Sequence, residues 1–509
     1  MMRKPLPFLL MAGLLSGCTM IPDFKLPGFS ASQNWDEVPG YTLPMGDEAA
    51  TDLAWQEFFG SPELSQVIST ALEHNKDLKT AALNIEEARA LYRIDRSDLF
   101  PDINANGDAA ISKGSDVNSI TGRGEKRESY EANLGVASYE LDLFGRIRSN
   151  NQSALNEYLA TQEAHTVVRN ALIAEVANAY LQLLADQKLL SLTQQTLKAQ
   201  FRTHDILSQS LENGVSTEQD VARASTAVET ARVNLHQYIR NVAQDKNALF
   251  LLMGVPHDDT YLPQTTLDEI VLKDNLDPEV PSEVLLRRPD IRQAEHQLRA
   301  RNADIGAARA AFFPSITLTG TYGYASDSLD NLFSSGAFGA WSFLPQITMP
   351  IFRAGENKAN LELAEIRSEM AVVNYEDVIQ TAFAEVSDEL AARATLDEQL
   401  KSQQRLVSAA RKVYDISQAR YDSGIDSFLS VLDAQRELYT YEQNEIEIQR
   451  QRLANMVNLY KALGGGTVVE QEQPEPVSSG LDDPNSISSD DDISPAETID
   501  EFTSSPDGV

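Results

Sequence analysis

The sequence predicts a mixed α and β fold in which one module of long helices and a few strands occurs twice. Three glycines of the first half recur 210 residues later, a spacing given by 355 minus 145. The pairs are Gly145 and Gly355, Gly214 and Gly424, and Gly254 and Gly464. Long proline-free segments rich in Ala, Leu, Gln and Glu predict helices. Shorter segments that alternate apolar and polar residues predict strands. A repeat of this length indicates two copies of one large supersecondary module, and therefore an internal duplication.

The N-terminus has the pattern of a secretory signal. Arg3 and Lys4 precede an apolar run from Leu6 to Leu15 that is too short to remain as a membrane-spanning helix. Cys18 is the only cysteine, and its position resembles that of the lipidated cysteine in a bacterial lipobox. We expect residues 1–17 to be a signal peptide and Cys18 to carry lipid, including palmitate. The alternative is an ordinary signal with an incidental cysteine. A lone cysteine excludes a disulfide framework and a thiolate metal site.

The charge of the chain is strongly negative and partly local. The formal net charge is −34, and twelve Asp and Glu with no Lys or Arg follow Val469. These residues predict an acidic disordered tail. The remainder carries −34 plus 12, or −22, which argues against nucleic acid as a partner. Beyond the signal, the sequence offers no apolar run of about twenty residues, so a membrane crossing would have to use strands.

The first long helix is expected between Gly145 and Asn213, and the second half repeats it. Apolar residues step by seven along both, which is typical of helices that bury one seam against neighbours. The row in the first half is Val176, Leu183, Leu190, Leu197 and Leu211, with His204 in one slot, and the row in the second half is Val386, Leu400, Val407, Tyr414 and Tyr421, with Arg393 in one slot.

Each long helix is expected to end in a tight turn and a returning helix. Gly214 and Gly424 favour the left-handed C-terminal turn. Thr217 and Ser427 are candidate N-caps of the returning helices. Each half therefore predicts a helical hairpin whose tip lies at its glycine.

Two strands are expected in each half, near residues 102–111 and 130–143, and near residues 314–325 and 339–352. Ile316 and Leu318 alternate with Thr317 and Thr319, the pattern of a transmembrane barrel strand or of a half-buried soluble hairpin. Four strands cannot close a barrel, because about eight are the usual minimum. We therefore expect the chain to oligomerise, and three copies would supply twelve strands and twelve long helices.

Three segments resemble the TolC-like outer-membrane factors, most closely their lipoprotein branch typified by OprM and NodT. The segments are residues 287–295 (RRPDIRQAE), Phe313-Pro314-Ser315, and residues 429–435 (LSVLDAQ). The resemblance implies a trimeric outer-membrane exit duct, with a twelve-stranded transmembrane β-barrel and an all-α coiled-coil barrel in the periplasm. It implies the duct of a tripartite efflux system, in which an inner-membrane pump of the RND type and a periplasmic adaptor deliver the cargo.

The resemblance also places a periplasmic entrance in the helix after the second tip. It implies an acidic ring at Asp433 and an apolar constriction at Leu429, since carboxylates on a threefold axis hold cations and repel anions. Ser430 stands where some relatives have a second aspartate, and Asp426 where others have an arginine. Tyr421 is expected to donate a hydrogen bond to Asp220. For Asp433, the alternative is a solvated helix face.

The resemblance places adaptor contacts at the two tips, and the alternative is that these residues only turn the chain. The residues concerned are Asn213, Gly214 and Val215, and Ser423, Gly424 and Ile425. The six histidines are scattered without a metal-ligand spacing, and the sequence has no phosphate-binding glycine loop. We therefore expect no metal, no cofactor and no enzymatic activity.

Two alternatives remain beside the efflux duct: the duct of a type I protein or peptide secretion system, and a non-conducting lipid-anchored periplasmic scaffold of coiled coils. The expected organisation is a signal peptide at 1–17, a lipidated extended segment at 18–61, a first repeat at 62–260, a linker at 261–286, a second repeat at 287–466 and the acidic tail at 467–509.

Overall fold

The structure is a computed structural model, and it describes residues 19–28, 48–113, 126–262, 264–274, 276–277, 287–334 and 338–466. The expected signal peptide, Cys18 and the acidic tail lie outside the described residues.

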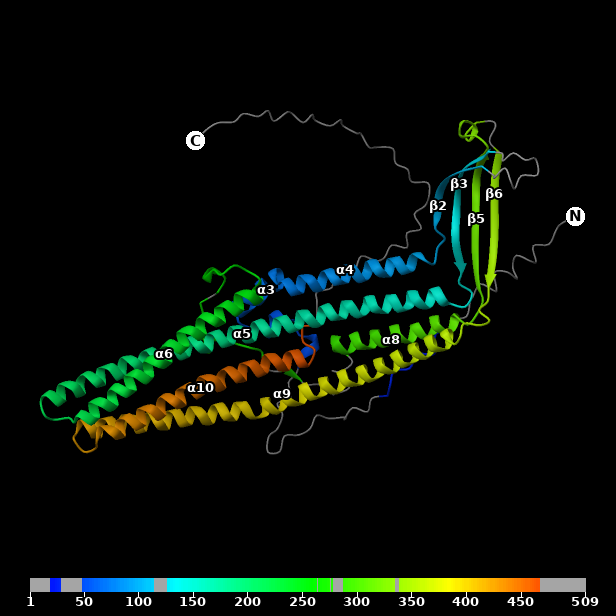
Figure 1. The fold of residues 1–509 in the computed structure, drawn as a ribbon. Helices are drawn as coiled ribbons and strands as arrows, with labels where there is room; N and C mark the ends of the chain where they lie inside the picture. Colours follow the sequence, from blue (N-terminus) through cyan, green and yellow to red (C-terminus); the bar gives the residue numbers. More distant parts are fainter. Residues whose placement is uncertain are drawn as a thin grey trace, which may run out of the picture. The chain divides into compact units, whose positions relative to one another are not determined.

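Helices make up most of the described chain (Figure 1). Their bounds are α2 (Trp55–Phe58), α3 (Pro62–His74), α4 (Lys76–Ser97), α5 (Arg146–Glu212), α6 (Glu218–Met253), α8 (Pro289–Ala310), α9 (Glu356–Asp422) and α10 (Phe428–Ala462). Both α5 and α9 have 67 residues, so each is about 100 Å long at ~1.5 Å per residue. The returning helix α6 packs on α5, α10 packs on α9, and α8 lies against both α5 and α9. In the part of the chain that is described, no helix is both long and apolar enough to cross a membrane.

One antiparallel sheet has the strand order β2-β3-β5-β6. The strands are β2 (Ile103–Lys113), β3 (Lys126–Leu141), β5 (Ser315–Ser326) and β6 (Phe338–Thr348). The pairing of β3 with β5 joins the two halves of the chain, and a Cβ on Gly323 would lie 2.1 Å from the Ala132 oxygen, so only glycine allows this close approach. β2 and β6 are therefore the edges of the sheet. A second sheet pairs β1 (Glu48–Ala49) with β4 (Leu276–Asp277). Short 3₁₀ turns occupy Ala50–Asp52, Asp259–Tyr261, Leu267–Glu269 and Leu329–Asn331.

The seam along α5 differs from the expectation. Val176 and Leu183 are buried, but Leu211, at the far end of the expected apolar row, is exposed. A second row, offset by three residues, is buried instead along the lower part of the helix, and its members are Asp186, Thr193, Gln200 and Leu207. Residues three and four apart lie on one helix face, so the expected row and the offset row alternate along the same face. In this part of α5 the more buried of the two rows is largely polar. We call Asp186, Thr193 and Gln200 the polar row. In α9 the expected row is buried or half-buried from Val386 to Tyr414.

The largest apolar core lies where α3 and the turn before it pack on the middle of α5 and on the ends of α6 and α10. Phe58 stacks on Tyr460 with 4.2 Å between ring centroids, and the Tyr460 hydroxyl donates to the Leu53 carbonyl at 2.6 Å. Burial of large aromatic and aliphatic side chains makes this the main stabilising region of the described chain.

Arg288, in the segment 287–295, connects three helices. Its buried guanidinium donates to Asp290 at 2.6 Å, to Glu385 at 2.8 Å and to the Ala462 carbonyl at 2.8 Å. It therefore ties the start of α8 to α9 and to the end of α10. The Arg288 side chain is 8% exposed, whereas those of Asp290 and Glu385 are 29% and 45% exposed. Loss of a carboxylate partner is therefore expected to be destabilising, because it leaves the buried guanidinium with fewer compensating charges.

Candidate functional site

The two tips share one backbone geometry. Gly214 and Gly424 have φ angles of 73° and 72°, in the left-handed region, and a Cβ on either would meet no atom within 4 Å. The amides of Val215 and Ile425 donate to carbonyls five residues back, which closes the last turn of each long helix as in a Schellman motif. Both side chains are well exposed. The tips therefore present a rigid turn with one outward aliphatic side chain each.

The returning helices begin differently after the two tips. The Thr217 hydroxyl oxygen accepts from the Asp220 amide at 3.2 Å, so Thr217 is an N-cap as expected. Ser427 holds the N-cap position of α10, but its side chain makes no cap hydrogen bond. The second tip is instead closed by an ion pair, in which Arg420 contacts both oxygens of Asp426 at 2.5 and 2.9 Å.

The expected pair of Asp220 and Tyr421 lies at the base of the tips. The Asp220 carboxylate accepts from the Thr217 hydroxyl at 2.6 Å. Tyr421 packs edge-on against Phe428, with ring centroids 5.6 Å apart, in a cluster that joins both hairpins. Burial raises the pKa of the Tyr421 hydroxyl, and the negative charge of Asp220 raises it further, so the two groups are close in space. No hydrogen bond joins them among the described residues.

Leu429 and Asp433 lie one turn apart on α10 and line one cavity with residues of α5 and α6. The cavity encloses about 300 Å³. The Asp433 side chain is 57% exposed, and its carboxylate lies 3.9 Å from the Arg436 guanidinium. The structure thus brings together the two residues expected at the constriction.

Further polar residues that sequence patterns did not single out also line this cavity, among them Gln200, Arg223 and Arg436. Gln200 is only 4% exposed, and its Oε1 has no hydrogen-bond donor among the described residues. Its sequence signal is the seven-residue step that it shares with Asp186 and Thr193, which places polar residues in an otherwise apolar seam.

The polar row continues above the cavity. The Thr193 hydroxyl lies 2.8 Å from the Tyr439 hydroxyl, and Gln182 donates to Asp186 at 3.0 Å. Asp245 of α6 faces Asp186, and its Oδ2 is buried without a donor in the described chain. Burial, together with the facing Asp186 carboxylate, raises the pKa of Asp245 to about 7. Two facing carboxylates cannot both ionise at low cost, so this pair holds a proton near neutral pH.

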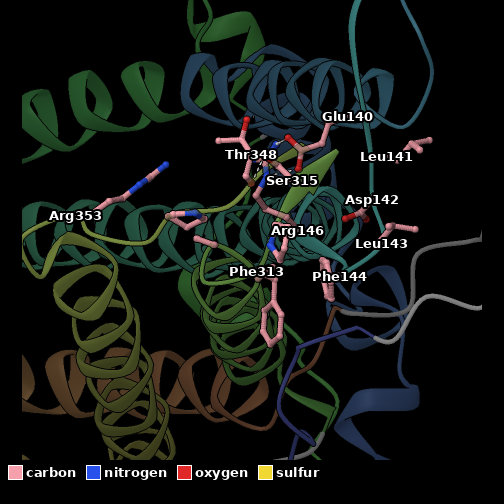
Figure 2. Close-up of a pocket in the computed structure, with 14 residues that line it drawn as sticks. Glu140, Leu141, Asp142, Leu143, Phe144, Arg146, Phe313, Ser315, Thr348 and Arg353 are labelled. Carbon is pink, nitrogen blue, oxygen red and sulfur yellow. Dashed lines mark hydrogen bonds and ion pairs between the residues drawn. The ribbon is translucent and has the colours of Figure 1, made fainter. Parts of the chain in front are cut away.

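A second pocket, here called the junction pocket, lies where the sheet meets the start of α5 and the end of α8 (Figure 2). It encloses about 240 Å³. Phe144 and Phe313 stack at its base with 4.7 Å between centroids. Arg146 contacts Glu140 at 2.8 and 3.0 Å. Arg353 lines the pocket from the loop after β6.

The described N-terminal segment follows α8 to the same level of the molecule. Asn302 donates to the Pro22 carbonyl at 3.0 Å, and the Arg299 guanidinium lies 4.6 Å from the centroid of the Phe24 ring. A Cβ on Gly306 would lie 2.6 Å from Ile21 Cγ1 and 2.7 Å from Ser149 Oγ. Gly306 therefore allows the segment to pass between the end of α8 and the start of α5.

Comparison with known proteins gives one consistent result. The family model described as outer membrane efflux protein matches residues 67–255 and 280–465. The toluene efflux pump outer membrane protein TtgC of Pseudomonas putida is 45% identical, over 92% of this chain and 96% of its own. The outer membrane protein OprJ of Pseudomonas aeruginosa is 41% identical, over 91% and 97%. The open-state outer membrane channel MtrE of Neisseria gonorrhoeae is 39% identical, over 88% and 98%, with a TM-score of 0.80.

Proposed function

The chain belongs to the outer membrane efflux protein family and is an outer-membrane efflux channel of a Gram-negative bacterium, and from this premise we propose that it works as a homotrimeric duct. The observation that carries the proposal is the sheet with two free edges. β2 and β6 each have 11 residues, and within the described chain each has no strand partner on its outer side. Long unpaired edges pair with another chain unless something covers them. Three copies joined edge to edge give a closed barrel of twelve strands.

The surface of the helices supports the same assembly. α9 exposes an apolar stripe at the three- and four-residue spacing of a helix face, and its members are Leu363, Ile366, Met370 and Val373. α4 exposes a second set at Leu83, Leu91 and Ile94. Unpartnered apolar stripes of this kind mark protein contacts, and we propose that α4 of one copy covers α9 of the next. The duct wall then consists of twelve long helices.

We propose that Asp433 and Leu429 form the narrow entrance in the trimer. The exposed Asp433 carboxylate has Arg436 as a distant neighbour, so its charge is weakly compensated within one copy. Three such carboxylates on one axis would select cations, and a ring of leucines would resist wetting. Asp220 and Tyr421, at the base of the tips, are proposed to support the closed arrangement.

The partners follow from the family and from the geometry of the tips. We propose that a periplasmic adaptor contacts the turns around Gly214 and Gly424, where Val215 and Ile425 point outward. The pump would be an inner-membrane protein of the RND type, which selects the cargo and supplies the energy. Small organic compounds are the proposed cargo, because TtgC is named for toluene. The names of the relatives support the efflux duct rather than a protein secretion duct or a scaffold.

We further propose that Cys18 carries the lipid anchor and that the two halves arose by duplication. Ile21, three residues after Cys18, lies beside Gly306 and Ser149, at the level where the helices meet the sheet, which suits a lipid anchor in the membrane. The equal lengths of α5 and α9, and the matching tips, support the duplication. No cofactor is proposed.

The test is single-channel conductance of the membrane-extracted trimer in planar bilayers, for the wild type and for Asp433→Ala. We expect small cation-preferring currents that lose their preference in the variant. Asp422→Ala, on the exposed end of α9, is the matched control and should leave the preference unchanged. A monomer that never conducts would overturn the duct and favour the scaffold. A conducting trimer whose cation preference is unchanged by Asp433→Ala would support the duct and reject the proposed role of Asp433 at the entrance.

A further inference from the structure

The loop between β6 and α9 exposes consecutive apolar side chains. Ile351 is 94% exposed and Phe352 is 88% exposed, and Met349 is exposed as well. Arg353 follows directly and reaches the rim of the junction pocket (Figure 2). A monomer in water rarely leaves such a run uncovered, so this loop is built to contact something apolar.

The corresponding segment in the first half has no net charge, because its carboxylates pair with its own arginines. The Asp142 carboxylate accepts from the Arg148 amide at 2.9 Å and from the Ile147 amide at 3.3 Å, at the N-terminus of α5. It also pairs with the Arg148 guanidinium at 3.0 Å, while Glu140 pairs with Arg146. A carboxylate of the chain thus occupies the anion-favouring end of α5.

The second half lacks both carboxylates. At the offset of 210 residues, Pro350 stands in place of Glu140 and Phe352 in place of Asp142. Among the described residues, Arg353 and Lys358 have no ion-pair partner. Residues 349–358 contain two cations and one carboxylate, so their net charge is +1. The loop therefore combines an apolar tip with an uncompensated positive charge at the start of α9.

The backbone holds this arrangement in place. Ala354 has a φ of 47° and Gly355 a φ of 90°, so the chain turns sharply between Arg353 and α9. A left-handed alanine is unfavourable, and such strain is kept where the surroundings require a particular local shape. In Figure 2, Arg353 lies at one side of the pocket and Asp142 at the other, so the paired carboxylate does not reach it.

We propose that residues 349–353 form a lipid-docking surface, in which Ile351 and Phe352 enter the membrane and Arg353 binds the phosphate of phosphatidylglycerol. The inference rests on the proposed function, because it needs the sheet to lie in the outer membrane. Amphipathic segments with aromatic and cationic residues settle at the boundary between headgroups and acyl chains. The surface is continuous with the exposed side chains of β6, among them Phe343 and Ile347. Anionic headgroups attract basic residues that lie just outside the apolar region.

The experiment uses the full-length trimer in detergent, stripped of lipid and then titrated with phosphatidylglycerol or phosphatidylcholine. Retained lipid is counted by native mass spectrometry. We expect the wild type to prefer phosphatidylglycerol, and Arg353→Gln to weaken its retention about fivefold, the effect of one basic residue near an anionic surface. Phe352→Ser should weaken retention of both lipids. Arg309→Gln is the matched control, because Arg309 is exposed but already lies near Glu365.

Two results would overturn the docking surface. One is equal retention of phosphatidylglycerol by the wild type and Arg353→Gln, and the other is equal retention of the two lipids by the wild type. Conductance of the same preparation separates this inference from the proposed function. A conducting trimer without the lipid preference rejects only the docking surface, whereas a protein that never enters bilayers rejects the duct.

Discussion

The facing carboxylates Asp186 and Asp245 give the hairpin of α5 and α6 a stability that depends on pH. The pKa of Asp245 is raised in the folded chain to about 7 and returns to its ordinary, lower value on unfolding. Between about pH 4 and pH 7 the folded state therefore binds more protons than the unfolded state, so stability falls as pH rises through this range and is constant above it.

Asp245→Asn should remove this dependence, because an amide can donate to Asp186 without losing a proton. At pH 7.5 we expect the variant to be more stable by about 1–2 kcal/mol, a value reduced for the partial solvent access of Asp245. Thermal unfolding from pH 5 to pH 8 measures the effect. Asp205→Asn, on the exposed side of α5, serves as the control. Parallel pH profiles for Asp245→Asn and the wild type would refute the shared proton.

Residues whose role depends on the backbone were predictable, and residues whose role depends on neighbours were not. Gly214 and Gly424 were found because a helix end needs a left-handed residue, and only glycine takes it without strain. Arg223 gave no local signal, and the seven-residue step of Gln200 with the polar row gains meaning only from a cavity built by three helices. The same holds for Asp245, which matters only because Asp186 faces it across two helices.

Among the elements, the tips give the sharpest prediction. A Cβ at Gly424 meets no neighbour, so Gly424→Ala acts through the φ angle of 72° alone. The left-handed conformation costs alanine roughly 1–2 kcal/mol, which should speed hydrogen exchange of the Gly424 and Ile425 amides about 5- to 30-fold. The main unfolding transition should hardly move, because the large apolar core is remote. Gly424→Asn is the matched variant, since asparagine tolerates this conformation better. Similar exchange in both variants would show that the turn is not the limiting feature.

The long helices and their turns were predicted because proline-free, helix-favouring sequence and glycine stops act locally. The strands lie close to the expected ranges, although β3 begins four residues earlier, at Lys126 rather than Tyr130. The predicted seam of α5 holds at Val176 and Leu183, which are buried, but toward the tip the row offset by three residues is buried instead. A seven-residue step identifies an apolar row, but two rows share each helix face, and the packing of α6 and α10 decides which one is deeper.

At the scale of the whole molecule, a single chain leaves strand edges unpaired and strand faces exposed that an assembly would cover. Neither edge of the sheet has a strand partner among the residues that the structure describes, and β2 and β6 are almost wholly exposed. The count of four strands points to oligomerisation, because four strands cannot enclose a channel. The number of copies cannot be read from local sequence, since it depends on the tilt of strands and on the angle between neighbouring chains.

The apolar stripe on α9 allows the assembly to be tested away from the membrane. In the proposed trimer, Met370 and Val373 are covered by α4 of the next copy, so the double variant Met370→Asp, Val373→Asp would bury unpaired carboxylates. Even a neutral polar group buried without a partner costs ~2–7 kcal/mol, and an unpaired charge costs more, so we expect the trimer to dissociate. Light scattering of the extracted protein after size-exclusion chromatography measures its mass. Glu369→Lys, on the neighbouring polar face of α9, also changes the charge but should leave the trimer intact. If the double variant remains trimeric, α4 does not cover this stripe and the chains meet through another face.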